Sequence, residues 1–155
     1  MDLQAVIPLL GRPADDPRVR DLLKDAGAAA GPTLKKGDTD AYVEVIAAGI
    51  YFVFTDEATY RKTPGGKVGV GPLLLTNVTA YCAATAKYSP YTGSLAFGLL
   101  ASEGRDATRA KLGPPEVAVD RRRLDRWSKD GTWVYVVYAA DLQSIERAGV
   151  QSPDL

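Results

Sequence analysis

The sequence contains no histidine and only one cysteine, Cys82, among its 155 residues. Without an imidazole the chain cannot form a Ser-His-Asp triad, a Cys-His pair or a histidine metal site, and no side chain has an ordinary pKa near neutrality. One cysteine also excludes an intrachain disulfide and a multi-cysteine zinc site. We therefore expect no cofactor and no tightly bound transition metal.

The sequence also lacks an excess of charge and a long apolar run. Lys and Arg (19) balance Asp and Glu (19), whereas nucleic-acid binders usually carry a basic excess. No stretch is long and apolar enough to cross a bilayer, and the first ten residues do not resemble a secretory signal. These features predict a cytoplasmic protein that binds neither nucleic acid nor membranes.

The composition is otherwise that of an ordinary globular protein. Hydrophobic residues make up 46% and charged residues 25% of the chain, which excludes disordered and fibrous classes. A chain of this length is the usual size of one domain. We expect a single domain over residues 1–155.

Two helices are predicted from their end signals. Asp16 is a favourable cap, Pro17 suits the first helical position, and Gly27 ends a segment with helical apolar spacing. A second, more polar helix is predicted to begin after a cap at Ser102 and to stop at Gly113, before two prolines.

Segments rich in β-branched and aromatic residues predict strands at 42–47, 50–55, 73–82, 117–127 and 132–138. Residues 142–150 are predicted as a last strand or a short helix. The glycine-rich segment 62–72 lacks the residue order of a phosphate-binding loop and precedes a strand, so it is predicted as a hairpin or mobile loop.

The order of a helix followed by strands occurs twice, in residues 9–82 and 91–150. Each half has a cap residue and, eleven positions later, a terminating glycine, and Gly49 to Phe54 parallels Gly131 to Val136. We predict an α+β fold with an antiparallel sheet, or two joined sheets, and few helices packed on one face. The two halves are predicted to be a tandem pseudo-repeat of a helix-plus-strands unit.

Tyrosines near loops are candidates for a binding surface, because tyrosine combines a large contact area with a polar tip. Tyr81, Tyr88 and Tyr91 surround one loop, and Tyr51 and Tyr60 flank another. Core or edge packing is the alternative interpretation of the same residues.

The only basic and aromatic cluster lies at residues 121–127. It contains Arg121, Arg122, Arg123, Arg126 and Trp127, interleaved with aspartates. A salt-bridged hairpin edge and a protein-binding patch are both consistent with this mixture, since arginine and tryptophan are enriched in interfaces.

Two further groups favour structural roles. Cys82 lies in a predicted strand with no neighbour that would activate it, and we expect a buried thiol. Asp38, Asp40 and Glu44 match neither a calcium loop nor a catalytic carboxylate pair, and we expect a solvated loop end.

A resemblance to known proteins begins at residue 91. The segment Tyr91 to Leu99, the following helix, Lys111-Leu112-Gly113-Pro114-Pro115 and the strand Thr132 to Tyr138 resemble small bacterial immunity proteins that are encoded beside polymorphic toxins. The pattern is also similar to the small lipoprotein of the outer-membrane barrel-assembly machine, but this chain lacks that protein's lipid-attachment cysteine. The resemblance covers about residues 91–150, with a fainter echo over 9–82, and brings no active-site motif.

The resemblance implies a non-enzymatic inhibitor that binds a cognate toxin and occludes its active site. A small enzyme that uses carboxylates or a tyrosine, and a structural or assembly adaptor, are the alternatives. The predicted partner-binding residues are Tyr88, Tyr91, Arg122, Arg126 and Trp127. Asp38, Asp40, Asp56 and Glu57 are the alternative anchors for a toxin with a basic cleft.

Overall fold

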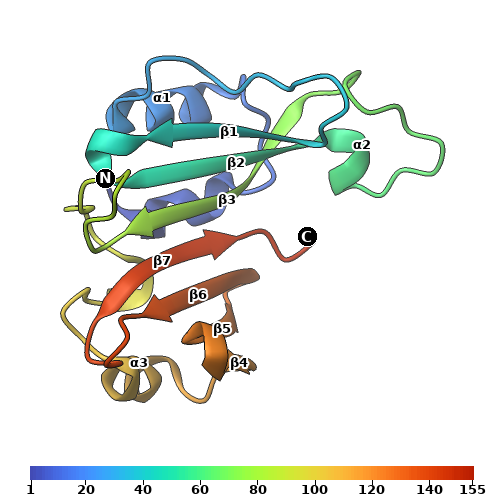
Figure 1. Cartoon of the computed structure of the whole chain (residues 1–155). Coiled ribbons are helices and arrows are strands. Elements are labelled where there is room, and N and C mark those ends of the chain that lie inside the picture. The colour runs from blue at the N-terminus through green and yellow to red at the C-terminus, as the bar shows by residue number, and fades with distance from the viewer.

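The computed structural model describes residues 1–155, and its central element is one seven-stranded antiparallel sheet (Figure 1). The strands are β1 (Asp40–Val45), β2 (Ile50–Asp56), β3 (Leu73–Tyr81), β4 (Val117–Val119), β5 (Leu124–Lys129), β6 (Thr132–Tyr138) and β7 (Ile145–Gln151). Their order in the sheet is β1-β2-β3-β7-β6-β5-β4. The predicted α+β fold is confirmed, with one sheet rather than two.

The helices are α1 (Pro17–Ala26), α2 (Glu57–Tyr60) and α3 (Arg105–Leu112), with short 3-10 segments η1 (Leu3–Leu9), η2 (Ile46–Ala48), η3 (Ala96–Gly98) and η4 (Asp120–Arg122). In Figure 1, α1 and η1 lie behind β1 to β3, and α3 lies at the other end of the sheet. Apolar residues of α1, η1 and α3 share one core cluster with the strands. The prediction of few helices on one face is thus confirmed. None of the helices has the length and apolar character that crossing a membrane requires.

Helix α1 follows its sequence signals closely. The Asp16 carboxylate accepts a hydrogen bond from the backbone N–H of Arg18 at 2.9 Å, which satisfies one of the free donors at the helix start. Gly27 ends the helix in the left-handed conformation, with φ of 89°. Both predicted ends are confirmed.

Helix α3 begins two residues later than predicted. Its cap is Gly104, and the backbone N–H of Arg105 donates to the carbonyl of Leu142 at 2.9 Å. A Cβ atom at position 104 would meet the Gln143 backbone at 2.9 Å, so the 142–143 segment occupies the place of a side-chain cap. Ser102 is therefore not the cap.

The predicted strand 117–127 is in fact a hairpin. The chain turns at η4, and Arg123 adopts a left-handed conformation with φ of 52° and ψ of 35°. The β1–β2 turn has the same shape, with Gly49 at φ of 65° and ψ of 33°. Sequence reading missed the second turn because arginine occupies a position where glycine is the usual residue.

The two halves form a continuous sheet because β7 inserts between β3 and β6. Residues 142–150 were predicted as either a strand or a short helix, and most of them form the strand β7. The first half contributes a three-strand meander after α1, and the second contributes a four-strand meander after α3. The predicted halves therefore differ by one strand, and their duplication stays a prediction.

Candidate functional site

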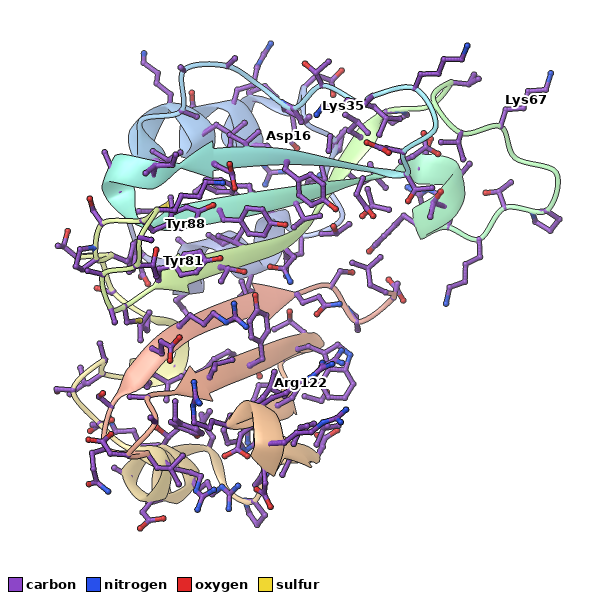
Figure 2. The ribbon with its side chains drawn as sticks, viewed as in Figure 1. Asp16, Lys35, Lys67, Tyr81, Tyr88 and Arg122 are labelled. Atoms are coloured by element: carbon purple, nitrogen blue, oxygen red, sulfur yellow. The ribbon has the colours of Figure 1, made fainter.

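The sheet has one face that no helix covers, which we call the open face. Side chains alternate between the two sides of a strand, and the register between strands places one set of side chains opposite the helical core. This set consists of Asp40, Tyr42, Glu44, Tyr51, Val53, Asn77, Thr79, Tyr81, Val117, Val119, Leu124, Arg126, Ser128, Trp133, Tyr135, Val137, Arg147 and Gln151. Aromatic side chains are concentrated here, and Figure 2 shows the labelled Tyr81 and Tyr88 on this side of the sheet.

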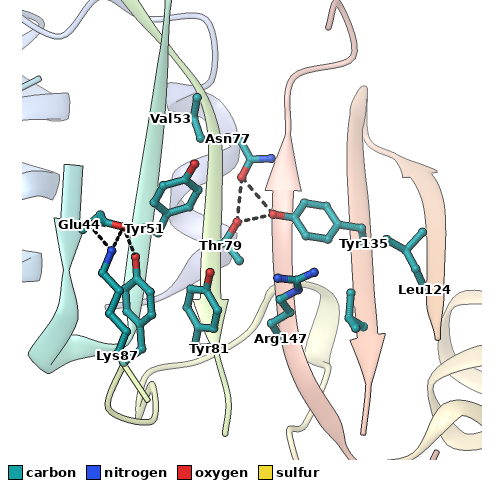
Figure 3. A pocket seen from close by; sticks show the side chains of 12 residues that line it. Glu44, Tyr51, Val53, Asn77, Thr79, Tyr81, Lys87, Leu124, Tyr135 and Arg147 are labelled. Carbon is teal, nitrogen blue, oxygen red and sulfur yellow. Dashed lines mark hydrogen bonds and ion pairs between the residues drawn. The ribbon is translucent and has the colours of Figure 1, made fainter. Parts of the chain in front are cut away.

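Tyr135 lies across the middle of the open face (Figure 3). Its hydroxyl donates to the side-chain oxygen of Asn77 at 3.0 Å and hydrogen-bonds the hydroxyl of Thr79. The ring passes over Gly149 of β7, where an added Cβ would meet the tyrosine and the Val78 carbonyl. Gly149 thus allows a side chain of β6 to reach β3 and to tie the two halves of the sheet together.

A loop after β3 closes one end of the open face. Tyr88 stacks on Tyr81 with ring centroids 4.1 Å apart, and its hydroxyl donates to Glu44 at 2.6 Å. The Lys87 ammonium donates to both oxygens of the same carboxylate at 2.7 Å. We call Glu44, Lys87 and Tyr88 the β1–loop clamp, because they hold the loop against the edge strand.

The open face is hollowed at its centre. A recess of about 570 Å³ lies between the β1–loop clamp and Leu124, with Tyr51, Tyr135 and Arg147 among its lining residues (Figure 3). A second hollow of about 600 Å³ shares Glu44 and Tyr51 with the first and extends to the loop that precedes β1. Together the two hollows, which adjoin at Glu44 and Tyr51, form one extended depression in the open face.

Two stacked pairs extend the aromatic character beyond the recess. Tyr42 and Tyr51 stack with ring centroids 5.7 Å apart on β1 and β2. On the other half, the Arg126 guanidinium lies 4.0 Å from the centre of the Trp133 ring. This geometry is a cation–π contact, which fixes the orientation of both side chains.

The surroundings of the open face shift the pKa values of three tyrosines and one carboxylate. Burial raises the pKa of Tyr51 to about 12 and also raises the pKa values of Tyr135 and Tyr88. A hydrogen bond from Lys87, followed by one from Tyr88, lowers the pKa of Glu44 below its ordinary value. A general acid or base works best with a pKa near the operating pH, and these shifts lead away from neutrality.

Other reactive groups do not extend the chemistry of the site. Cys82 is half-buried, and burial raises the pKa of its thiol to about 11, so the thiolate needed for nucleophilic attack is disfavoured. The structure contains no cluster of three or more Asp, Glu or Cys side chains placed to hold a metal ion.

Two of the five predicted partner-binding residues lie on or against the open face. Arg126 belongs to it directly. Tyr88 covers one end, but the expectation that it is exposed is wrong, because its ring stacks on Tyr81 and only 6% of the residue is exposed. Arg122 is exposed in the η4 turn. Tyr91 is half-buried, and its hydroxyl donates to the Met1 carbonyl at 2.7 Å.

Trp127 was expected to be exposed, and this expectation is wrong. Only 1% of the residue is accessible, and its indole N–H donates to the Gly113 carbonyl at 2.8 Å. Successive residues of a strand point to opposite faces, so Trp127 points into the core while Arg126 points outward. The tryptophan on the open face is instead the partly exposed Trp133 of β6, which pairs with Ser128, the residue after Trp127.

Of the acidic alternatives, Asp56 is also unavailable for binding. It is fully buried and accepts hydrogen bonds from the backbone N–H groups of Ala58 at 3.0 Å and Gly69 at 2.8 Å. It therefore caps α2 and holds the glycine-rich loop. Asp38 and Asp40 line the second hollow, whereas Glu57 forms an ion pair with Arg61 at 2.8 Å.

The sequence interpretation missed Tyr42, Trp133, Tyr135 and Arg147. The sequence contained a signal for the residues of β6, because Trp133, Tyr135 and Val137 occupy alternate positions of that strand. That alternation places them on one face, but sequence alone does not tell which face the helices cover.

We compared the chain with models of protein families, with curated proteins and with solved structures, and none of the three comparisons gives a match.

Proposed function

We propose that this chain is a non-enzymatic inhibitor that binds a cognate toxin through its open face and occludes the toxin's active site. The observation that carries the proposal is the uncovered side of the sheet, where aromatic residues and arginines surround the extended depression. Such residues dominate the energetics of protein interfaces. A monomeric domain has no structural reason to expose them together.

The chemistry of the same face favours an inhibitor over an enzyme. An enzyme that used tyrosine or a carboxylate would need a pKa moved toward neutrality, whereas the tyrosine pKa values are raised and the Glu44 pKa is lowered. Glu44 is also engaged by Lys87 and Tyr88. The two hollows adjoin at Glu44 and Tyr51 and form one extended depression, as contact with a protein surface requires.

Co-expression tests the proposal directly. Each gene that flanks this one in the source genome is expressed in a sensitive bacterium, with and without this chain. We expect one product to be toxic and its toxicity to be suppressed by a stoichiometric amount of the chain. The proposal is overturned if no flanking product is toxic, or if suppression requires only a catalytic amount.

Matched substitutions then locate the surface. Tyr42 and Leu100 are exposed to the same degree, 55% and 54%, but only Tyr42 lies on the open face. Tyr42→Ala and Trp133→Ala are each expected to weaken toxin binding by about 30-fold or more, the loss typical of a hot-spot side chain. Leu100→Ala is expected to leave calorimetric affinity unchanged, and the reverse ranking contradicts the proposed surface.

A further inference from the structure

Charge is divided unevenly over the open face. On β5, β6 and β7 its charged residues are Arg126 and Arg147, and no acidic side chain accompanies them. The acidic residues of the open face lie at the opposite edge, on β1, where Glu44 is neutralised by Lys87. The β5–β7 half is therefore a cationic surface within a chain of no net charge.

Arg126 is held in place but its charge is not used within the chain. Its guanidinium stacks on Trp133, it forms no ion pair, and its buried Nε makes no hydrogen bond. Stacking leaves the edge of a guanidinium free, and that edge matches the two oxygens of a carboxylate. An arginine fixed in this way loses less conformational entropy when it binds an anion.

Arg147 supplies the second free cation. It is exposed, forms no ion pair, and lies at the wall of the recess between Tyr81 and Tyr135 (Figure 3). Arg126 and Gly149 both align with Tyr135 in the register of the sheet, and Arg147 is two residues from Gly149 on β7. From the standard strand spacing and rise, the two arginine Cα atoms are on the order of 12 Å apart.

We propose that Arg126, held by Trp133, and Arg147 bind two carboxylates of an acidic, extended segment of the partner protein, while Tyr135, which lies between the two arginines in the register of the sheet, packs against an apolar residue of that segment. This inference rests on the proposed function and names the chemistry of the partner. A separation of about 12 Å corresponds to residues i and i+4 of an extended chain, whose side chains lie on one side. The toxin surface that is covered is therefore lined by carboxylates, not by the basic groups of a nucleic-acid groove.

A peptide probe tests the charge preference without the toxin. The probe is the acetylated and amidated peptide Glu-Ser-Phe-Ser-Glu, and its control is the same peptide with glutamine in place of both glutamates. In NMR titrations at low salt we expect millimolar binding of the acidic peptide, with shifts at the Trp133 indole and Tyr135. Equal shifts with the glutamine peptide, or no shifts at these residues, overturn the inference.

Charge variants separate this inference from the proposed function. Arg126→Gln and Arg147→Gln are each expected to reduce peptide binding at least threefold, and Arg126→Glu with Arg147→Glu to reduce toxin affinity more than tenfold. Arg20→Glu with Lys24→Glu, the same charge change on the exposed side of α1, is the control. If toxin binding depends on Trp133 but not on these arginines, the inference fails and the proposed function stands. If the peptide binds as expected but no flanking product is toxic, the proposed function fails alone.

Discussion

Specific polar contacts hold single residues of the open face in place. Among these residues, Glu44 makes contacts that reach far along the chain. It connects the edge strand β1 to a loop more than forty residues away through Lys87 and Tyr88. These contacts favour the ionised carboxylate and lower its pKa. A lowered pKa means that the folded state holds the proton less tightly than the unfolded chain does, so the stabilisation is present above the ordinary pKa of 4.5 and is lost as the pH falls through the folded value.

We therefore expect the β1–loop clamp to open in acid before the domain unfolds. In NMR spectra recorded from pH 7 downward, the Tyr88 ring resonances should move toward their values in a mobile loop as Glu44 becomes protonated. Glu44→Gln should show a loosened loop already at pH 7 and no such acid step. A control variant, Glu57→Gln, removes a carboxylate at the far end of β2 and should keep the step; an unchanged step in Glu44→Gln would contradict this account.

A buried ion pair fixes α3 to the sheet. Asp125 is 2% exposed, accepts two hydrogen bonds from Arg109 at 2.7 Å, and accepts a third from the Tyr138 hydroxyl at 3.0 Å. Burial, and then the nearby Asp125 charge, raise the pKa of Tyr138, so this phenol stays protonated and continues to donate. Removing the arginine leaves a buried carboxylate without its counter-charge.

Arg109→Met is accordingly expected to lower the free energy of unfolding by about 3 kcal/mol. This value is at the lower end of the range for a broken buried ion pair, because the Arg109 side chain is partly exposed. Arg61→Met breaks an exposed pair with Glu57 on one short helix and should cost less than about 0.5 kcal/mol. Urea denaturation of both variants measures the difference. A similarly small loss of unfolding free energy in both variants would show that the Arg109–Asp125 pair does not stabilise the fold.

At the scale of elements, the β1–β2 turn at Gly49 packs against the loop that follows β3. Gly49 is left-handed, with φ of 65°, and the backbone of Ser89 to Tyr91 lies directly against its Cα. Gly37 has a similar positive φ of 91° but open space around it. The two glycines therefore separate the cost of backbone strain from the cost of a steric clash.

Gly37→Ala should lose roughly 1 kcal/mol, the usual cost of a side chain in the left-handed region. Gly49→Ala should lose about 1–3 kcal/mol more, because the 89–91 backbone must move as in an overpacked core. Thermal unfolding of the two variants compares them. Equal losses would mean that the loop adapts freely and that it does not depend on the β1–β2 turn.

The elements that the sequence predicts well are those with local signals. The ends of α1 carry a carboxylate cap and a left-handed glycine, and β3 is a long apolar run, so both are found where expected. The start of α3 was misplaced because a distant backbone segment at Leu142 satisfies its first N–H group. The η4 turn was missed because Arg123 takes a conformation that sequence reading assigns to glycine.

At the scale of the whole molecule, the fold class could be predicted but the strand order could not. The placement of β7 between β3 and β6 depends on pairings between residues about seventy positions apart, such as Ala80 with Ala148, and no local pattern specifies them. The same limit applies to the candidate site. Tyr135 reaches Asn77 only because Gly149 lies in the intervening strand, an arrangement that is not visible in either half of the sequence.

The strand order gives the molecule two unlike sides. The core and the helices occupy one side, and the open face with its aromatic and cationic residues occupies the other. If the proposed function is correct, a partner must cover the second side and leave α1 and α3 exposed. This requirement holds whichever individual side chains contribute most of the binding energy.

The measurement that tests this central claim most directly is hydroxyl-radical footprinting of the chain alone and in complex with the toxic product of the flanking gene. We predict that oxidation of Tyr42 and Trp133 falls several-fold in the complex, while oxidation of Leu100, which is as exposed as Tyr42, is unchanged. Protection of Leu100 and of the α1 surface, with Tyr42 and Trp133 still reactive, would contradict the account and place the partner on the helical side.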